Sequence, residues 1–167
     1  MGMDLNHTWT TYPSPIGTLT LTATSRGIDG LFFPEGSPAL DRARRSTEAF
    51  AQARAQLDEY FACDRREFDL TLDAAAATPF QQAVWRQLAT IPYGETISYT
   101  ALASLLGRTG AVRAVGAAVA RNRLPIIVPC HRVVGADGSL TGYLGGLPRK
   151  RALLNLERPW EPCSGTA

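Results

Sequence analysis

The stretch Ile126–Val134 reads IIVPCHRVV, an apolar run that meets a proline and continues into a cysteine, a histidine and an arginine. A short apolar run bounded by a proline predicts a buried strand over residues 126–128. A cysteine reacts as its thiolate, which cationic or hydrogen-bonding neighbours promote. Because His131 and Arg132 follow it directly, Cys130 is a candidate nucleophile at the end of this strand.

In a regular strand, His131 would point away from Cys130, since successive side chains alternate. A turn after Pro129 would instead bring both side chains to one pocket, in direct contact or joined by a water. A carboxylate would then orient the imidazole, and Glu157 on the last helix is the candidate. The alternative is a small core cysteine beside a chance histidine. The residues alone leave both interpretations open.

The segment before this stretch predicts three helices. Thr78-Pro79-Phe80-Gln81 has the pattern of a capping box with proline at the first helical position, and Ile91–Gly94 ends that helix. Ser98 can cap a second helix that stops at Gly107, and a third runs over residues 111–120. The last two resemble a helix-turn-helix, although many helical hairpins never bind DNA.

The helix over residues 111–120 has two predicted faces. Val112, Val115, Gly116 and Val119 recur at buried spacing, whereas Ala114, Ala117, Ala118 and Arg121 form the exposed stripe with Arg113 at its edge. Small exposed side chains would let this helix approach a nucleic-acid groove closely. The alternative is an alanine-rich helix that simply packs tightly.

The N-terminal part predicts a small α+β unit. Residues 18–24 alternate strictly, as in a half-buried strand with its threonines outward, and residues 28–33 return as a second strand. A loop at 34–38, a helix over 47–61 and a strand at 68–72 follow. We therefore expect an α+β protein with an N-terminal domain over 1–75 and a mainly helical C-terminal domain over 76–167. Its final helix begins at Pro148, and the tail after Pro159 is expected to be loosely ordered.

Charge and composition narrow the function classes. The net charge is only +2, but five arginines and no acidic residue lie between Arg108 and Arg132, and a second basic cluster spans 149–151. This half should present a basic face to phosphates. No apolar stretch approaches membrane-spanning length and no signal peptide is visible, so we expect a cytoplasmic location with no membrane partner. Three cysteines and two histidines without ligand spacing predict neither a disulfide framework nor a metal site.

Several motifs together resemble the O6-alkylguanine-DNA alkyltransferase family. The central one is Ile127–Val134, the family's active-site signature. Others fall in family order and spacing over essentially all of residues 78–157: Phe80–Trp85, Ile91–Thr96, Ser98-Tyr99, Arg113–Gly116, Asn122, Gly138, Gly142-Tyr143, Gly145-Gly146, Lys150 and Leu153–Glu157. The N-terminal part is similar in layout, with weaker motifs.

The resemblance implies a ribonuclease-H-like N-terminal domain, a winged helix-turn-helix C-terminal domain, and a suicide reaction that moves an alkyl group from O6-alkylguanine in duplex DNA to the protein. It leaves O4-alkylthymine open as a second substrate. Carried over by position, Cys130 is the acceptor, His131 its base through a water, Glu157 the residue that orients His131, and Asn122 the hinge asparagine.

The remaining roles concern the lesion and the DNA. Tyr99 would help rotate the nucleotide out and donate a proton to the leaving guanine, while Val133, Tyr143 and Leu144 would line the base pocket. Arg113 resembles the finger that fills the gap left by an extruded base. Ala114 and Ala117 would let the helix sit in the minor groove. No cofactor and no metal are implied, and a monomer is expected.

Two departures and three competing functions remain. Arg123 stands where the family usually has proline, and Cys63 stands where glycine is common. A non-enzymatic lesion-binding relative would lack the acceptor cysteine. A cysteine hydrolase would need an oxyanion-type site, and a plain helix-turn-helix regulator would leave Cys130-His131 unexplained.

Overall fold

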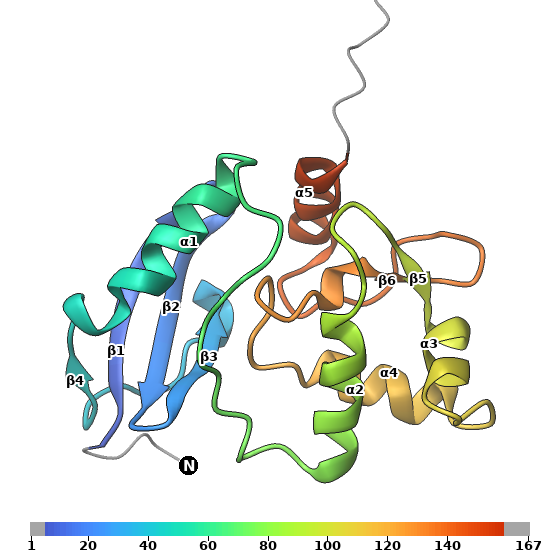
Figure 1. Ribbon diagram of the computed structural model, residues 1–167, viewed down its shortest axis with the longest axis horizontal. Helices are drawn as coiled ribbons and strands as arrows, with labels where there is room; N and C mark the ends of the chain where they lie inside the picture. Colours follow the sequence, from blue (N-terminus) through green and yellow to red (C-terminus); the bar gives the residue numbers. More distant parts are fainter. Residues whose placement is uncertain (1–5, 159–167) are drawn as a thin grey trace, which may run out of the picture.

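The computed structural model describes residues 6–158, which form two units side by side (Figure 1). In the first unit, helix α1 (Ala51–Phe61) lies across one face of a four-stranded sheet of order β3-β2-β1-β4. The strands are β1 (Thr8–Ser14), β2 (Gly17–Thr24), β3 (Gly27–Phe32) and the short β4 (Arg44–Arg45). Neighbouring strands are antiparallel except β4, which is parallel to β1.

The middle of strand β2 is buried on both faces, which corrects one expectation. Leu19 and Leu21 pack into the core under α1, but Thr20 and Thr22 on the opposite face are also buried rather than exposed to solvent. Their hydroxyls have partners: Thr22 Oγ1 donates to Asp29 Oδ1 at 2.7 Å, and Ser37 Oγ donates to Thr20 Oγ1 at 3.3 Å. The alternation in β2 therefore places leucines on one buried face and threonines on the other. A threonine can be buried in this way when its hydroxyl has a hydrogen-bond partner.

Two other N-terminal elements differ from expectation. The helix predicted over 47–61 is a 3-10 turn, η2 (Glu48–Phe50), followed by α1; a second 3-10 turn, η1 (Pro34–Gly36), occupies the predicted loop. The strand predicted at 68–72 is reduced to one parallel bridge between Ile28 and Leu72. Its backbone still follows β3, since Ile28 N–H donates to Thr71 O and Asp73 N–H to Ile28 O.

The second unit is mainly helical. It contains α2 (Pro79–Ala89), α3 (Tyr99–Leu105), α4 (Val112–Ala120) and α5 (Leu147–Glu157), with a two-stranded parallel ribbon of β5 (Ile97–Ser98) and β6 (Val133–Val134). The predicted capping box is present in α2, where Thr78 and Gln81 bond reciprocally. The Ser98 hydroxyl caps α3 by accepting from Ala101 N–H at 3.0 Å.

The apolar run before Pro129 is not a strand. Ile126 has a φ of 75°, and Val128 N–H donates back to Leu124 O at 2.8 Å, so the segment folds into turns. A buried turn and a buried strand show the same short apolar signal, which explains the error. The chain then forms a 3-10 turn, η3 (Cys130–Arg132), and enters β6.

No helix in residues 6–158 is long and apolar enough to cross a membrane. The expectation of a loosely ordered tail after Pro159 lies outside the described residues.

Candidate active site

Cys130 opens onto a cavity of about 320 Å³ between α3, α4 and the glycine-rich loop 142–146. Cys130 is 5% exposed. The cavity is lined by Tyr99, Gly116, Val119, Ala120, Asn122, Cys130, Gly142, Tyr143 and Leu144. Of the residues expected to contact a base, Tyr143 and Leu144 line this cavity. Val133 does not, because it is fully buried in β6 opposite Ile97.

After Pro129 the chain forms the 3-10 turn η3, so the strand alternation that would separate Cys130 from His131 does not apply. His131 is completely buried, and its Nε2 lies 2.7 Å from Glu157 Oε1. A carboxylate acceptor at this distance places the proton on Nε2 and leaves Nδ1 as an acceptor. Nδ1 is buried without a hydrogen-bond partner among the described residues, so it is available to receive a proton.

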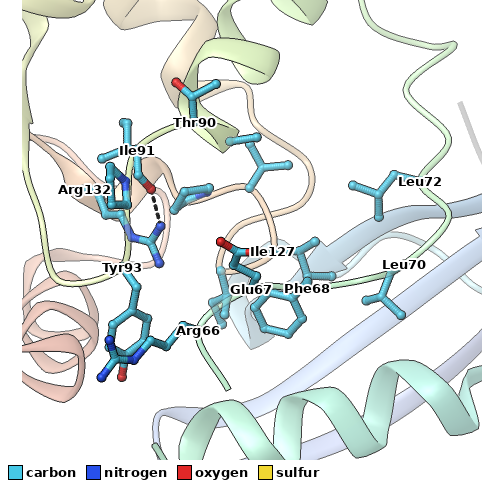
Figure 2. Close-up of a pocket in the computed structure, with 15 residues that line it drawn as sticks. Arg66, Glu67, Phe68, Leu70, Leu72, Thr90, Ile91, Tyr93, Ile127 and Arg132 are labelled. Atoms are coloured by element: carbon cyan, nitrogen blue, oxygen red, sulfur yellow. Dashed lines mark hydrogen bonds between the residues drawn. The ribbon is translucent and has the colours of Figure 1, made fainter. Parts of the chain in front are cut away.

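Glu157 has two further partners that the sequence did not reveal. Arg132 donates from Nε to Oε2 at 2.8 Å and from Nη2 to Oε1 at 2.9 Å, and Tyr60 on α1 donates its hydroxyl to Oε1 at 2.7 Å. Arg132 also donates from Nη1 to the carbonyl of Ile91 at 2.6 Å, at the edge of a second cavity of about 390 Å³ (Figure 2). Glu157 is therefore fixed from both units of the fold.

These contacts set the protonation states. Burial raises the pKa of Cys130 to about 11, although the hydrogen bond from Asn122 and the charge of Lys150 oppose the rise. Burial lowers the pKa of His131 and outweighs the nearby Glu157 carboxylate. Burial alone would raise the pKa of Glu157, but hydrogen bonds from His131, Arg132 and Tyr60 lower it to about 2. The resting site thus holds a neutral thiol, a neutral imidazole and an ionised carboxylate.

The neighbours of Cys130 were expected to promote its thiolate, but burial raises the pKa of the thiol instead. A thiol with a raised pKa is a weak nucleophile at neutral pH, so Cys130 must lose its proton as it reacts. His131 Nδ1 has no hydrogen-bond partner among the described residues, and Glu157 supports its basicity from the other ring nitrogen.

Asn122 follows Arg121, the C-cap of α4, and braces the loop that carries Cys130. Its Nδ2 donates to Val128 O at 2.8 Å, and its Oδ1 accepts from Leu124 N–H at 3.0 Å. Both bonds are buried, and the residue is 2% exposed. The two bonds join the end of α4 to the turn that precedes Cys130.

Tyr99 lies at the first position of α3, where the Ser98 cap fixes the helix start beside the cavity. Burial, followed by the nearby Cys130, raises the pKa of its hydroxyl, so Tyr99 is protonated and able to donate.

The glycine-rich loop is held from both sides. Lys150 is fully buried, and its Nζ donates to Thr141 O at 2.9 Å and Gly142 O at 3.3 Å. From the N-terminal unit, Phe33 meets the Tyr143 ring edge-on at 5.8 Å between centroids. A Cβ at Gly145 would lie 2.6 Å from the Phe33 ring, so this position has no room for a side chain. Sequence reasoning did not assign a role to Lys150 or Phe33.

The exposed face of α4 is narrower than expected. Arg113, Ala114 and Ala117 are exposed, but Ala118 is 3% exposed and its carbonyl accepts from Trp85 Nε1 at 3.0 Å. Among the five arginines of the basic stretch, Arg108, Arg113 and Arg121 are exposed. Arg132 is buried on Glu157. Arg123 faces Asp29 of the N-terminal unit. The basic face is thus formed by three arginines around α4.

Comparison with known proteins agrees with this geometry. Residues 8–74 match the family description "6-O-methylguanine DNA methyltransferase, ribonuclease-like domain", and residues 79–159 match its DNA binding domain. The chain is 49% identical over 158 residues to a methylated-DNA–protein-cysteine methyltransferase of Mycobacterium bovis, covering 93% of this chain and 95% of the relative. It is 43% identical over 157 residues to the constitutive enzyme of Bacillus subtilis, covering 90% and 94%.

Solved structures give the same result. The crystal structure of Mycobacterium tuberculosis O6-methylguanine methyltransferase superposes with a TM-score of 0.85 at 48% identity, covering 94% of this chain and 96% of that one. A DNA complex of the Mycobacterium tuberculosis protein matches equally well, at 49% identity and a TM-score of 0.85, covering 90% and 92%. This chain therefore belongs to the methylated-DNA–protein-cysteine methyltransferase family, DNA-binding proteins that repair O6-methylguanine directly by transferring the alkyl group to a cysteine of the protein.

Proposed function

We propose that Cys130 is the alkyl acceptor and that each molecule reacts once. The observation that carries this proposal is the position of Cys130 in the wall of the cavity, beside a histidine whose buried Nδ1 can take its proton. Cys63 is exposed and is not among the residues that line that cavity. A thioether is inert to hydrolysis because a thiolate is a poor leaving group from an alkyl carbon, and this accounts for single turnover.

The chemistry follows from the residues around the thiol. The Sγ–carbon bond forms as the bond from that carbon to guanine O6 breaks. The thiol proton passes through a bridging water to His131 Nδ1, and the departing guanine takes a proton from the Tyr99 hydroxyl. Exchange with solvent then returns His131 and Tyr99 to their neutral forms. Glu157 orients His131 and stabilises its cationic form during the transfer.

The pocket residues bind the base. Tyr143 and Leu144 form the apolar wall of the cavity, and Asn122 holds the loop that presents Cys130. We include O4-alkylthymine as a second lesion, because its ring is smaller than that of guanine and its alkyl carbon is also bound to an exocyclic oxygen. The position of Val133 does not support a direct contact with the base.

We further propose that a monomer binds duplex DNA through the minor groove with α4. The exposed alanines Ala114 and Ala117 allow close backbone approach, and Arg113 beside them is placed to enter the duplex when the damaged nucleotide rotates out. Arg108 and Arg121 then meet phosphates, which give affinity without sequence preference. We place this activity in the cytoplasm, at the nucleoid.

Mass spectrometry after mixing the protein with duplex DNA that carries O6-methylguanine tests the acceptor. We expect a single added methyl group on the peptide that contains Cys130, reached in one burst without further turnover. Cys130→Ser should abolish transfer, whereas Cys63→Ser should leave it intact. Methylation of another residue, or continued turnover by the wild type, would contradict the proposal.

The role of Arg113 is tested by comparing two substrates. Arg113→Ala should slow repair of the duplex by about tenfold or more, because extrusion costs a few kcal/mol that an inserted side chain offsets. The same variant should react normally with free O6-benzylguanine, which needs no extrusion. Arg42→Ala, which removes an exposed arginine from the N-terminal unit, is the matched control for charge. Equal losses on both substrates would rule out a role in extrusion.

A further inference from the structure

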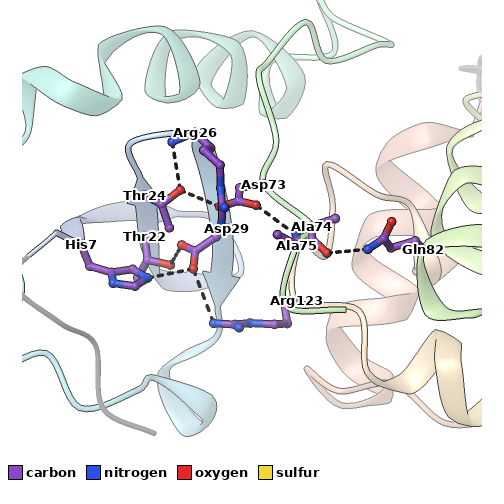
Figure 3. A network of polar contacts seen from close by, with 10 residues as sticks. All are labelled: His7, Thr22, Thr24, Arg26, Asp29, Asp73, Ala74, Ala75, Gln82 and Arg123. Atoms are coloured by element: carbon purple, nitrogen blue, oxygen red, sulfur yellow. Dashed lines mark hydrogen bonds and ion pairs between the residues drawn. The ribbon is translucent and has the colours of Figure 1, made fainter. Parts of the chain in front are cut away.

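Arg123 joins the Asn122 loop to strand β3 of the N-terminal unit. Its backbone carbonyl accepts from Leu31 N–H at 2.8 Å. Its Nη2 lies 3.8 Å from Asp29 Oδ2, and its guanidinium stands 5.7 Å from the centroid of the Phe32 ring. Figure 3 shows Arg123 reaching across from the C-terminal unit to Asp29 in the sheet. One residue is thus attached to β3 by its main chain, its charge and its planar face.

The carboxylate that Arg123 approaches is itself fixed. Asp29 is 8% exposed. Thr22 Oγ1 donates to its Oδ1 at 2.7 Å, and His7 Nε2 lies 3.2 Å from its Oδ2 (Figure 3). An aspartate held by neighbours on two sides offers Arg123 a stationary partner.

The segment that Arg123 anchors has reason to need an external restraint. Asn122 precedes it, and the turn from Leu124 to Val128 contains Ile126 at a φ of 75°. A β-branched residue in the left-handed region is strained, and such a conformation persists only where the surrounding structure enforces it. The same turn delivers Cys130 to the cavity.

We propose that Asp29 and Arg123 form a clasp through which the N-terminal sheet holds the Asn122 loop, and with it Cys130, in the reactive position. Both are positioning residues that act through Asn122. The inference rests on the proposed role of Cys130 as acceptor. Since the Arg123 side chain is 38% exposed, the ion pair is weak in itself, and its loss should change the rate more than the folding.

The test measures the rate of Cys130 benzylation by free O6-benzylguanine, which excludes any contact of Arg123 with DNA. Asp29→Asn keeps an acceptor for Thr22 and leaves the arginine in place, while Arg123→Met removes the other partner. We expect each variant to react about fivefold more slowly than the wild type, and the double variant to be no slower than the slower single variant. Arg123→Lys, which keeps the charge, should recover most of the rate.

Arg26→Met is the matched control. It breaks another cross-connection of the same sheet, the 3.1 Å ion pair between Arg26 and Asp73, whose arginine is also exposed. This variant should react at the wild-type rate. Thermal unfolding is measured for each variant, and all rates are compared at a temperature at which every variant is folded.

The pH profile separates positioning from general loosening of the fold. Cys130 is faced by Tyr99 from α3, Lys150 from α5, Tyr143 from the glycine-rich loop and His131 from its own turn, and these are unchanged in Asp29→Asn. Loss of the clasp loosens the Asn122 hydrogen bond that favours the thiolate, so the rate profile should move to higher pH. A loss of the same size at every pH would overturn the proposal.

The remaining outcomes are also decisive. Wild-type rates in both Asp29→Asn and Arg123→Met, or an equal loss in Arg26→Met, would overturn the clasp while leaving the acceptor role standing. A wild-type protein that is not alkylated at Cys130 at all would instead refute the proposed function.

Discussion

At the scale of single residues, Cys63 occupies a position after helix α1 where glycine is the usual residue. It follows the C-cap of α1 with a φ of 63°. Asp64 N–H donates to Glu59 O and Cys63 N–H to Tyr60 O, which is the hydrogen-bond pattern of a Schellman motif. Glycine normally occupies this position because it alone enters the left-handed region without a Cβ penalty. A cysteine at this position therefore introduces a small backbone strain at the end of α1.

We predict that Cys63→Gly raises the free energy of unfolding by about 1 kcal/mol. Removing the Cβ relieves the penalty of the left-handed conformation, and the greater flexibility of glycine in the unfolded chain offsets part of this gain. Urea unfolding at neutral pH measures it. Cys63→Ala, which keeps the Cβ, is the control and should not stabilise the protein. The exposed Sγ lies 3.9 Å from Leu156 O and contributes little. Equal effects of the two substitutions would contradict the strain argument.

Some residues of the candidate site could be identified from the sequence, and others could not. Cys130, His131 and Glu157 were predictable because their types and the resemblance point to a nucleophile, a base and a carboxylate. Arg132 was counted with the basic face, yet it is buried on Glu157. Tyr60 looked like one of several apolar residues on a helix face, yet its hydroxyl bonds Glu157 across 97 positions of chain. Such pairings arise from tertiary packing, which no local pattern encodes.

At the scale of elements, prediction succeeded where a cap or a long periodic face marks the structure. The start of α2 at its capping box and of α3 at Ser98 follow from local hydrogen bonds. The prediction of a strand before Pro129 was wrong, because a buried turn and a buried strand contain the same kinds of apolar side chain. The strand expected at 68–72 shortened to one bridge because the segment lies at the free edge of β3.

Helix α4 illustrates a finer limit of the same kind. Its periodicity correctly separated Val115 and Val119 from Ala114 and Ala117. Ala118 was placed on the wrong face because an alanine gives no hydropathic contrast, and only the contact with Trp85 on α2 decides its burial. The proposed DNA-binding stripe is accordingly narrower, with Arg113 at its edge.

At the scale of the whole molecule, side chains of both units meet around the candidate active site. Tyr60 reaches Glu157 from α1, Phe33 packs on Tyr143, and Arg149 on α5 bonds Glu35 bidentately at 2.9 and 3.2 Å. Tyr143 lines the cavity, Glu157 contacts His131, and Arg149 also donates to the carbonyl of Gly145 in the glycine-rich loop. The N-terminal unit is therefore part of the catalytic scaffold, and its stability is coupled to the protonation of the buried groups.

That coupling predicts a loss of stability in acid. The folded pKa of His131 is lowered, so below about pH 6.5, its ordinary value, the unfolded chain binds a proton that the folded site excludes, and stability falls. The folded pKa of Glu157 is lowered to about 2, so its contribution is complete above its ordinary value of 4.5 and is lost as pH falls from 4.5 towards 2. The free energy of unfolding should therefore fall in two steps with decreasing pH, the first from His131 and the second from Glu157.

Urea unfolding between pH 8 and pH 3 should show both steps, the lower of them worth at most ~3 kcal/mol for the Glu157 shift alone. Glu157→Gln should be less stable at neutral pH and should lose the dependence below pH 4.5, since it has no carboxylate to protonate. Glu35→Gln is the control, because its carboxylate also pairs with an arginine and has a lowered pKa but is 69% exposed, where ion pairs contribute little. If Glu35→Gln flattened the acid limb as strongly as Glu157→Gln, the acid sensitivity would come from surface charge and not from the shared buried site.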